Sequence, residues 1–139
     1  SYAIIIVYWF EMITKGKNMI NIDKKLDVAI TNLMDYCVDD YIRWSTNNGA
    51  KKLSDYCKRE VENGLGFKVK KGPKYIKILR EQGSQESVWG FVVATEKDKK
   101  FQVGDILMAA GWRGPARNKA RGNVLSGNFG SRWTGPNYL

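Results

Sequence analysis

The residues best suited to chemistry are cations near the end of the sequence, and their chemistry would be the binding of an anion. From Ile106 to Leu139 the chain has no Asp and no Glu. Five cations lie in this stretch: Arg113, Arg117, Lys119, Arg121 and Arg132. Arg forks and backbone amides exposed beside Gly can hold phosphate oxygens, and a ring such as Trp133 can stack on an unpaired base. These five cations and Trp133 form the predicted nucleic-acid-binding site.

Two other interpretations of this segment stay open. The aromatic residues could instead cap a sheet while the arginines form a solvated rim. An acidic protein could also be the partner, with the exposed aromatic rings as anchors and the arginines setting partner choice. No nucleic-acid-binding consensus motif accompanies the charge, so the charge alone favours the prediction.

The composition excludes several kinds of catalytic site. The chain has no His, which rules out His general bases, Ser-His-Asp and Cys-His arrangements, and zinc sites that need imidazole. Its two cysteines, Cys37 and Cys57, cannot supply a Cys₃ or Cys₄ zinc site, and we expect free thiols, with a disulfide as the alternative. The carboxylates are scattered. We therefore expect no catalytic residue, no metal and no cofactor, and a protein that is not an enzyme.

The net charge of +9 lies mostly in the second half of the chain. Such a charge favours nucleic acid, an anionic membrane or an acidic protein as partner. The apolar stretch Ser1–Phe10 is too short to span a bilayer, and we expect no membrane insertion. The sequence does not indicate an oligomeric state.

The first eighteen residues could be foreign to the natural protein. The chain starts with Ser, and Met19 opens a polar segment after Lys15-Gly16-Lys17, which a purine-rich ribosome-binding site would encode in frame. We predict that residues 1–18 are a translated upstream region. The alternative is a true N-terminal strand, Ala3–Phe10, at a sheet edge.

A helical hairpin is predicted for residues 19–66 of a single domain covering 19–139. Apolar residues recur every three or four positions from Asp23 to Trp44, with Asp23 as the N-cap. The predicted buried stripe is Leu26, Ile30, Leu33, Cys37, Tyr41 and Trp44. A second helix is expected from about Ala50 to Asn63, where Leu53, Cys57 and Val61 form the apolar side and Gly64 ends it.

An antiparallel sheet is predicted for residues 67–112, followed by a basic irregular tail over 113–139. Tyr75–Leu79 and Ser87–Thr95 form a hairpin, and a third strand follows Gly104. We expect Trp112 to be mostly buried at a strand end, with Arg113 and Arg117 facing water. The basic run from Lys68 to Arg80 fits a solvated strand face, which extends the tail's electropositive surface if the two lie side by side. Helices followed by strands indicate the α+β class.

From Tyr75 onward the chain resembles a family of small uncharacterised proteins of tailed bacteriophages. The stretches that carry the resemblance are Lys74–Ile78, Ser87–Val92, Gly104–Leu107, Ala109–Asn118, Ala120–Leu125 and Trp133–Leu139. The resemblance covers about the last 65 residues. It implies a phage origin and a location in the host cytoplasm, with the virion as the alternative. It implies no activity.

Overall fold

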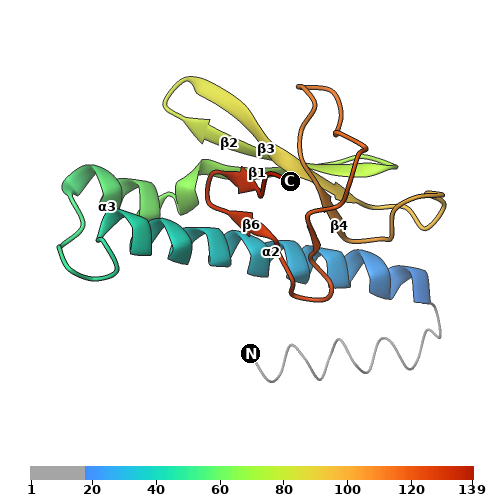
Figure 1. The fold of residues 1–139 in the computed structure, drawn as a ribbon, viewed down its shortest axis with the longest axis horizontal. Helices are drawn as coiled ribbons and strands as arrows, with labels where there is room; N and C mark the ends of the chain where they lie inside the picture. The colour runs from blue at the N-terminus through green and yellow to red at the C-terminus, as the bar shows by residue number, and fades with distance from the viewer. Residues whose placement is uncertain (1–17) are drawn as a thin grey trace.

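The computed structural model describes residues 18–139 and shows two layers, a long helix and an antiparallel sheet lying across it (Figure 1). The elements are α2 (Asn18–Ser45), α3 (Asp55–Glu62), the 3-10 helix η1 (Gly64–Gly66), β1 (Phe67–Lys71), β2 (Tyr75–Gln82), β3 (Gln85–Val93), β4 (Asp105–Leu107), β5 (Gly122–Asn123), β6 (Ser131–Arg132) and β7 (Gly135–Pro136). Strands β1 to β5 form one sheet in sequence order, and β6 pairs with β7. The predicted α+β class is confirmed. The prediction for residues 1–18 falls, apart from Asn18, outside the described residues.

Helix α2 buries the predicted stripe against the sheet as far as Tyr41, because its apolar residues recur at helical spacing. Two details of the prediction were wrong. The helix begins at Asn18, so Asp23 lies inside it and is not the N-cap. Trp44 is 64% exposed, since the next position on the buried side after Tyr41 is Ser45. Ser45 is buried and donates its hydroxyl to the carbonyl of Tyr41 at 2.7 Å.

Helix α3 is shorter than predicted and covers only the end of α2. It begins after Ser54, whose hydroxyl accepts a hydrogen bond from the amide of Cys57 at 3.2 Å, an N-cap that stops the helix from starting at Ala50. None of its residues is fully buried. The hydroxyl of Tyr41 donates to the sulfur of Cys57 at 3.3 Å and joins the two helices. Both cysteines are free thiols, as expected.

The β2–β3 hairpin at the centre of the sheet matches the predicted pairing. It turns at Gly83, whose φ of 60° favours Gly. Strand β1 pairs with β2 on one side, and β4 pairs with β3 on the other. Because side chains alternate across a sheet, Ile76, Ile78 and Val92 pack toward α2, whereas Phe91 and Val93 form a second cluster on the other side.

Short antiparallel pairs tie the tail to the rest of the fold. Strand β5 extends the sheet beside β4. The indole Nε1–H of Trp89 donates to the carbonyls of Arg132 and Trp133 at 3.3 and 3.1 Å. The amide of Trp133 donates to Asp40 of α2 at 3.0 Å, which brings the ribbon of β6 and β7 alongside the helix (Figure 1).

Candidate functional site

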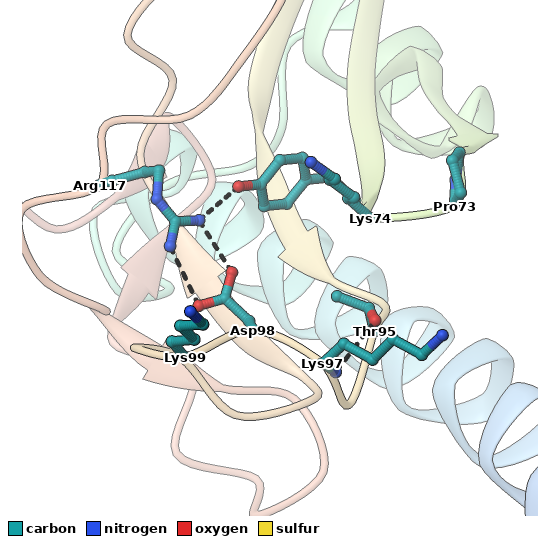
Figure 2. A pocket seen from close by; sticks show the side chains of 8 residues that line it. Pro73, Lys74, Thr95, Lys97, Asp98, Lys99 and Arg117 are labelled. Carbon is teal, nitrogen blue, oxygen red and sulfur yellow. Dashed lines mark hydrogen bonds and ion pairs between the residues drawn. The ribbon is translucent and has the colours of Figure 1, made fainter.

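A cavity of about 620 Å³ opens between the turn before β2, the loop after β3 and the tail loop that carries Arg117 (Figure 2). Its lining residues are Pro73, Lys74, Tyr75, Thr95, Lys97, Asp98, Lys99 and Arg117. The side chains of Lys74, Lys97 and Lys99 make no hydrogen bond or ion pair with other residues in the described part of the chain. Three ammonium groups at this opening are therefore available to an anion.

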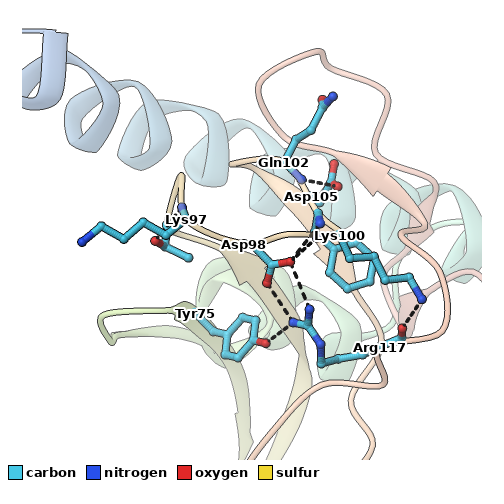
Figure 3. A network of polar contacts seen from close by, with 9 residues as sticks. Tyr75, Lys97, Asp98, Lys100, Gln102, Asp105 and Arg117 are labelled. Atoms are coloured by element: carbon cyan, nitrogen blue, oxygen red, sulfur yellow. Dashed lines mark hydrogen bonds and ion pairs between the residues drawn. The ribbon is translucent and has the colours of Figure 1, made fainter.

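Arg117 and Asp98 form the ordered side of this cavity. The guanidinium Nη1 and Nη2 of Arg117 donate to the two carboxylate oxygens of Asp98 at 2.9 and 3.0 Å, and Nη1 also donates to the hydroxyl of Tyr75 (Figure 3). The amides of Lys100 and Phe101 donate to Asp98 Oδ1 at 2.8 and 2.9 Å. This network joins β2, the loop after β3 and the tail.

The network fixes the charge state of both partners. The hydrogen bonds from Arg117, followed by those from the amides of Phe101 and Lys100, hold the pKa of Asp98 well below its ordinary value. The hydrogen bonds to Asp98 and then to Tyr75 raise the pKa of Arg117. Because the carboxylate of Asp98 neutralises the guanidinium, Arg117 orders the site more than it adds net charge.

A second cavity of about 320 Å³ adjoins the first, and the two share Pro73, Lys74 and Tyr75. The two cavities together form a surface that we call the basic face. Its charged lining residues are Lys70, Lys71, Lys74, Lys77, Lys97, Lys99, Arg113 and Arg117, with Asp98 as the one carboxylate among the lining residues. Lys71 is paired with Asp27 at 2.7 Å. The basic face thus retains a clear excess of positive charge.

The register of the sheet explains why these lysines gather. Lys70 on β1 lies opposite Lys77 on β2, and Lys77 lies opposite Phe91 on β3. Directly opposite residues share one side of a sheet. Phe91 belongs to the cluster away from α2, so the lysines of this row lie on the side of the sheet that the helix leaves uncovered.

Trp112 lies beside the basic face and is 50% exposed, so its predicted burial was wrong. The chain leaves β4 in a loop, which we call the Trp112 loop, running from Ala109 to Pro115. An antiparallel bridge between these two residues and a hydrogen bond from the amide of Ala110 to the carbonyl of Gly114 at 3.0 Å close it. Trp112 therefore stands out from the strand end, and its ring lies 4.7 Å from the ammonium of Lys77.

The predicted binding residues do not form one cluster. Arg113 lines the second cavity and Arg117 the first, and both are exposed as expected. Lys119 is exposed outside the two linings. Arg132 is exposed on β6, and its neighbour Trp133 packs edge-on against Tyr41 of α2 at 4.9 Å between ring centroids.

Arg121 stabilises the tail through hydrogen bonds to other residues of the tail. Its guanidinium donates to the carbonyl of Asn137 at 2.6 Å and to the side-chain oxygen of Asn118 at 3.2 Å, and its Nε donates to the carbonyl of Lys119 at 3.0 Å. These bonds hold the last residues of the tail against the loop before β5. The guanidinium is consequently occupied by protein acceptors.

Sequence reasoning left six cations of the basic face out of the predicted site: Lys70, Lys71, Lys74, Lys77, Lys97 and Lys99. The first four belong to the basic run that was interpreted as a solvated strand face. That interpretation fits most of the run, but Arg80 is buried and donates from Nε to the carbonyl of Leu65 at 2.8 Å. The aromatic residue Tyr75 lies among these lysines in the sequence, and this was the feature that could have indicated a binding surface there.

Two structural features are absent from the part of the chain that the structure describes, residues 18–139. No helix there combines the length and the apolar character needed to cross a bilayer. No group of three or more His, Cys, Asp or Glu side chains there could hold a metal ion. Burial raises the pKa of the Cys37 thiol to about 12, so Cys37 is protonated at neutral pH.

Residues 7–135 match DUF7717, a family of unknown function, and the chain belongs to this family. The comparisons with curated proteins and with solved structures found no match. Membership of an uncharacterised family agrees with the resemblance seen in the sequence. The phage origin stays a prediction.

Proposed function

We propose that the basic face binds nucleic acid without catalysis, mainly through the phosphate backbone. The observation that carries the proposal is the meeting of cations from three separate segments around Tyr75, with Asp98 as the one lining carboxylate. Lysines from the β1–β2 hairpin, lysines from the loop after β3 and Arg113 from the tail can contact successive phosphates. Such contacts position a protein on nucleic acid and carry little sequence information.

Arg117 and Asp98 support this function by holding the loops in place. The Nζ of Lys100 donates to the carbonyl of Arg117 at 2.7 Å, which adds a second tie between the same two loops (Figure 3). Ordered loops keep Lys97 and Lys99 near Lys74, so less conformational entropy is lost on binding. The phage origin implied by the resemblance would place this activity in the bacterial cytoplasm or the virion.

Fluorescence anisotropy with labelled oligonucleotides, titrated across a range of salt concentrations, tests the proposal. Affinity should fall steeply with salt, because each phosphate contact releases counterions. Lys74→Ala and Lys97→Ala should each lower the salt slope by about one, similarly for different sequences.

Lys58→Ala is the matched control. Lys58 is an exposed lysine on α3, at the other end of the molecule from the turn between β1 and β2 (Figure 1). The Lys58→Ala variant should bind nucleic acid as tightly as the unmodified protein. Absence of binding to DNA and RNA at low salt, or an equal loss in the control, would contradict the proposal.

A protein-binding role has its own supporting observation on α2. Trp44 is largely exposed, and its ring lies 5.1 Å from that of Trp133, which makes an aromatic surface separate from the two cavities. Exposed Trp residues are frequent anchors of protein interfaces. Pull-down from bacterial lysate with nuclease treatment separates the two functions: a partner that survives nuclease and is lost in Trp44→Ala favours this one.

A further inference from the structure

Trp112 presents an accessible aromatic ring at the edge of the basic face. Half of its surface is exposed, although a ring of this size is ordinarily buried in a core or an interface. The ammonium of Lys77 lies 4.7 Å from its centroid, within the range of a cation–π contact. That contact orients the ring and leaves the exposed part open to a ligand.

Trp112 has two glycines near it in its loop, and the backbone at both is open. Its neighbours in the Trp112 loop include Gly111 and Gly114, and a Cβ atom added at either would meet no atom within 4 Å. The loop therefore stands clear of the rest of the described protein on these sides. The open backbone agrees with the 50% exposure of Trp112, which leaves part of the ring accessible to a planar group.

Cations suited to phosphate lie directly beside the ring. Arg113 follows Trp112 in the chain and lines the second cavity together with Lys70, Lys74 and Lys77. Arg113 makes no hydrogen bond or ion pair with other residues of the described chain, so its guanidinium is free to bind. A ring for a base next to cations for the adjoining phosphates matches the two parts of one nucleotide.

Double-stranded nucleic acid could contact the cations of this surface but not the Trp112 ring. Its phosphates could reach the cations, but its bases are paired and stacked on each other, which hides their faces from a protein ring. Unpaired bases present those faces, and stacking on aromatic residues is the usual way in which single strands are held.

We propose that the basic face takes single-stranded nucleic acid, with an unpaired base stacked on Trp112 and its neighbouring phosphates held by Arg113 and Lys77. This inference rests on the proposed function and adds to it a substrate class and a residue that selects it. Trp112 supplies the preference for single strands, and the surrounding cations supply affinity common to all nucleic acids.

Anisotropy titrations at low salt with a labelled oligothymidylate and a duplex of equal length test the inference. Wild type should bind the single strand more tightly. Trp112→Leu should weaken single-strand binding about tenfold, the effect of losing one stacked base, and leave duplex binding nearly unchanged. Trp112→Phe should recover much of the loss because it restores a ring. Trp44→Leu, at an exposed Trp on α2, should change neither affinity.

The outcomes separate the two proposals. Equal affinity for the two oligonucleotides, or a Trp112→Leu variant that loses both affinities or neither, overturns the single-strand inference while phosphate binding stands. No binding to either oligonucleotide overturns the proposed function, and the inference falls with it. Thermal unfolding of each variant establishes that it is folded before it is titrated.

Discussion

Arg117 and Asp98 form a bidentate ion pair between two loops that lie nineteen residues apart in the chain. The side chain of Asp98 is 8% exposed and that of Arg117 is 43% exposed, so the carboxylate is covered while the guanidinium borders the cavity. The pair fixes the positions of the loops that supply Lys97 and Lys99. The geometry of the basic face therefore depends on the charge of a carboxylate.

The pair predicts a dependence of stability on pH. The pKa of Asp98 is lower in the folded chain than in the unfolded chain, so its carboxylate stabilises the fold above the ordinary Asp pKa of about 3.9. That contribution is lost progressively as the pH falls below about 5. Asp98→Asn should be less stable than wild type at neutral pH, and the difference should shrink in acid.

Urea unfolding of both proteins from about pH 2 to pH 7 measures this difference. Glu96→Gln is the control, because Glu96 is exposed in the same loop and makes no ion pair within the described chain. A deficit of Asp98→Asn that stays constant down to the lowest pH would show that the charge of Asp98 does not stabilise the fold.

Arg113 and Arg117 should differ in their effects on stability. Arg113→Ala should change the free energy of unfolding by no more than about 0.5 kcal/mol, because the side chain is exposed and unpaired among the described residues. Arg117→Ala should destabilise more, since it leaves the covered carboxylate of Asp98 without its partner. Chemical denaturation measures both values, and oligonucleotide titration should show weaker binding in both variants. Equal stability losses would refute the division between a free and an anchoring arginine.

Substitution of Trp112 and substitution of Trp89 should differ in their cost to stability. Trp112→Ala should cost about 1 kcal/mol, because a half-exposed ring leaves no closed cavity. Trp89→Ala should cost about 3 to 5 kcal/mol, since Trp89 is buried in the core between β3 and the tail. Guanidinium denaturation curves give both values. A loss near 3 kcal/mol in Trp112→Ala would mean that the ring is buried after all.

Gly130 should be intolerant of substitution. Its φ is 51°, and an added Cβ atom would overlap the carbonyl oxygen of Arg121. Gly130→Ala should destabilise the protein by more than about 1 kcal/mol, because the tail must move away from the loop before β5. Gly111→Ala, at a position with open space, should be nearly neutral in the same thermal melts. Similar melting temperatures for the two variants would contradict this close approach.

The parts of the fold that sequence could predict are those set by local patterns. Helical spacing of apolar residues located α2, and two apolar runs on either side of a turn located the β2–β3 hairpin. The start of α2 was missed because Asp23 is a good N-cap residue, but the five residues before it are also helical. The short α3 was overestimated because its Ser54 cap was not recognised.

The arrangement of the candidate site depends on contacts between residues far apart in the chain, which local sequence patterns do not show. Trp133, and not Trp112, supplies the half-buried ring beside the core, because Asp40 and Trp89 bind the backbone around Trp133 from far along the chain. Lys77 and Phe91 meet only through strand register. Sequence thus identified Arg113 and Arg117 as exposed cations, but it left open whether the basic hairpin lies beside them.

The hydrogen bonds between the tail and α2 can form only late in the synthesis of the chain. Cys37 donates its thiol to the carbonyl of Arg132 at 3.7 Å, and Asp40 accepts from the amide of Trp133, so these contacts join residues 95 and 93 positions apart. At about 5 to 20 residues per second, the ribosome needs roughly 5 to 20 seconds to make the intervening chain. During that time this part of the helix lacks its cover, and chains stalled before residue 131 present an apolar surface to chaperones and proteases.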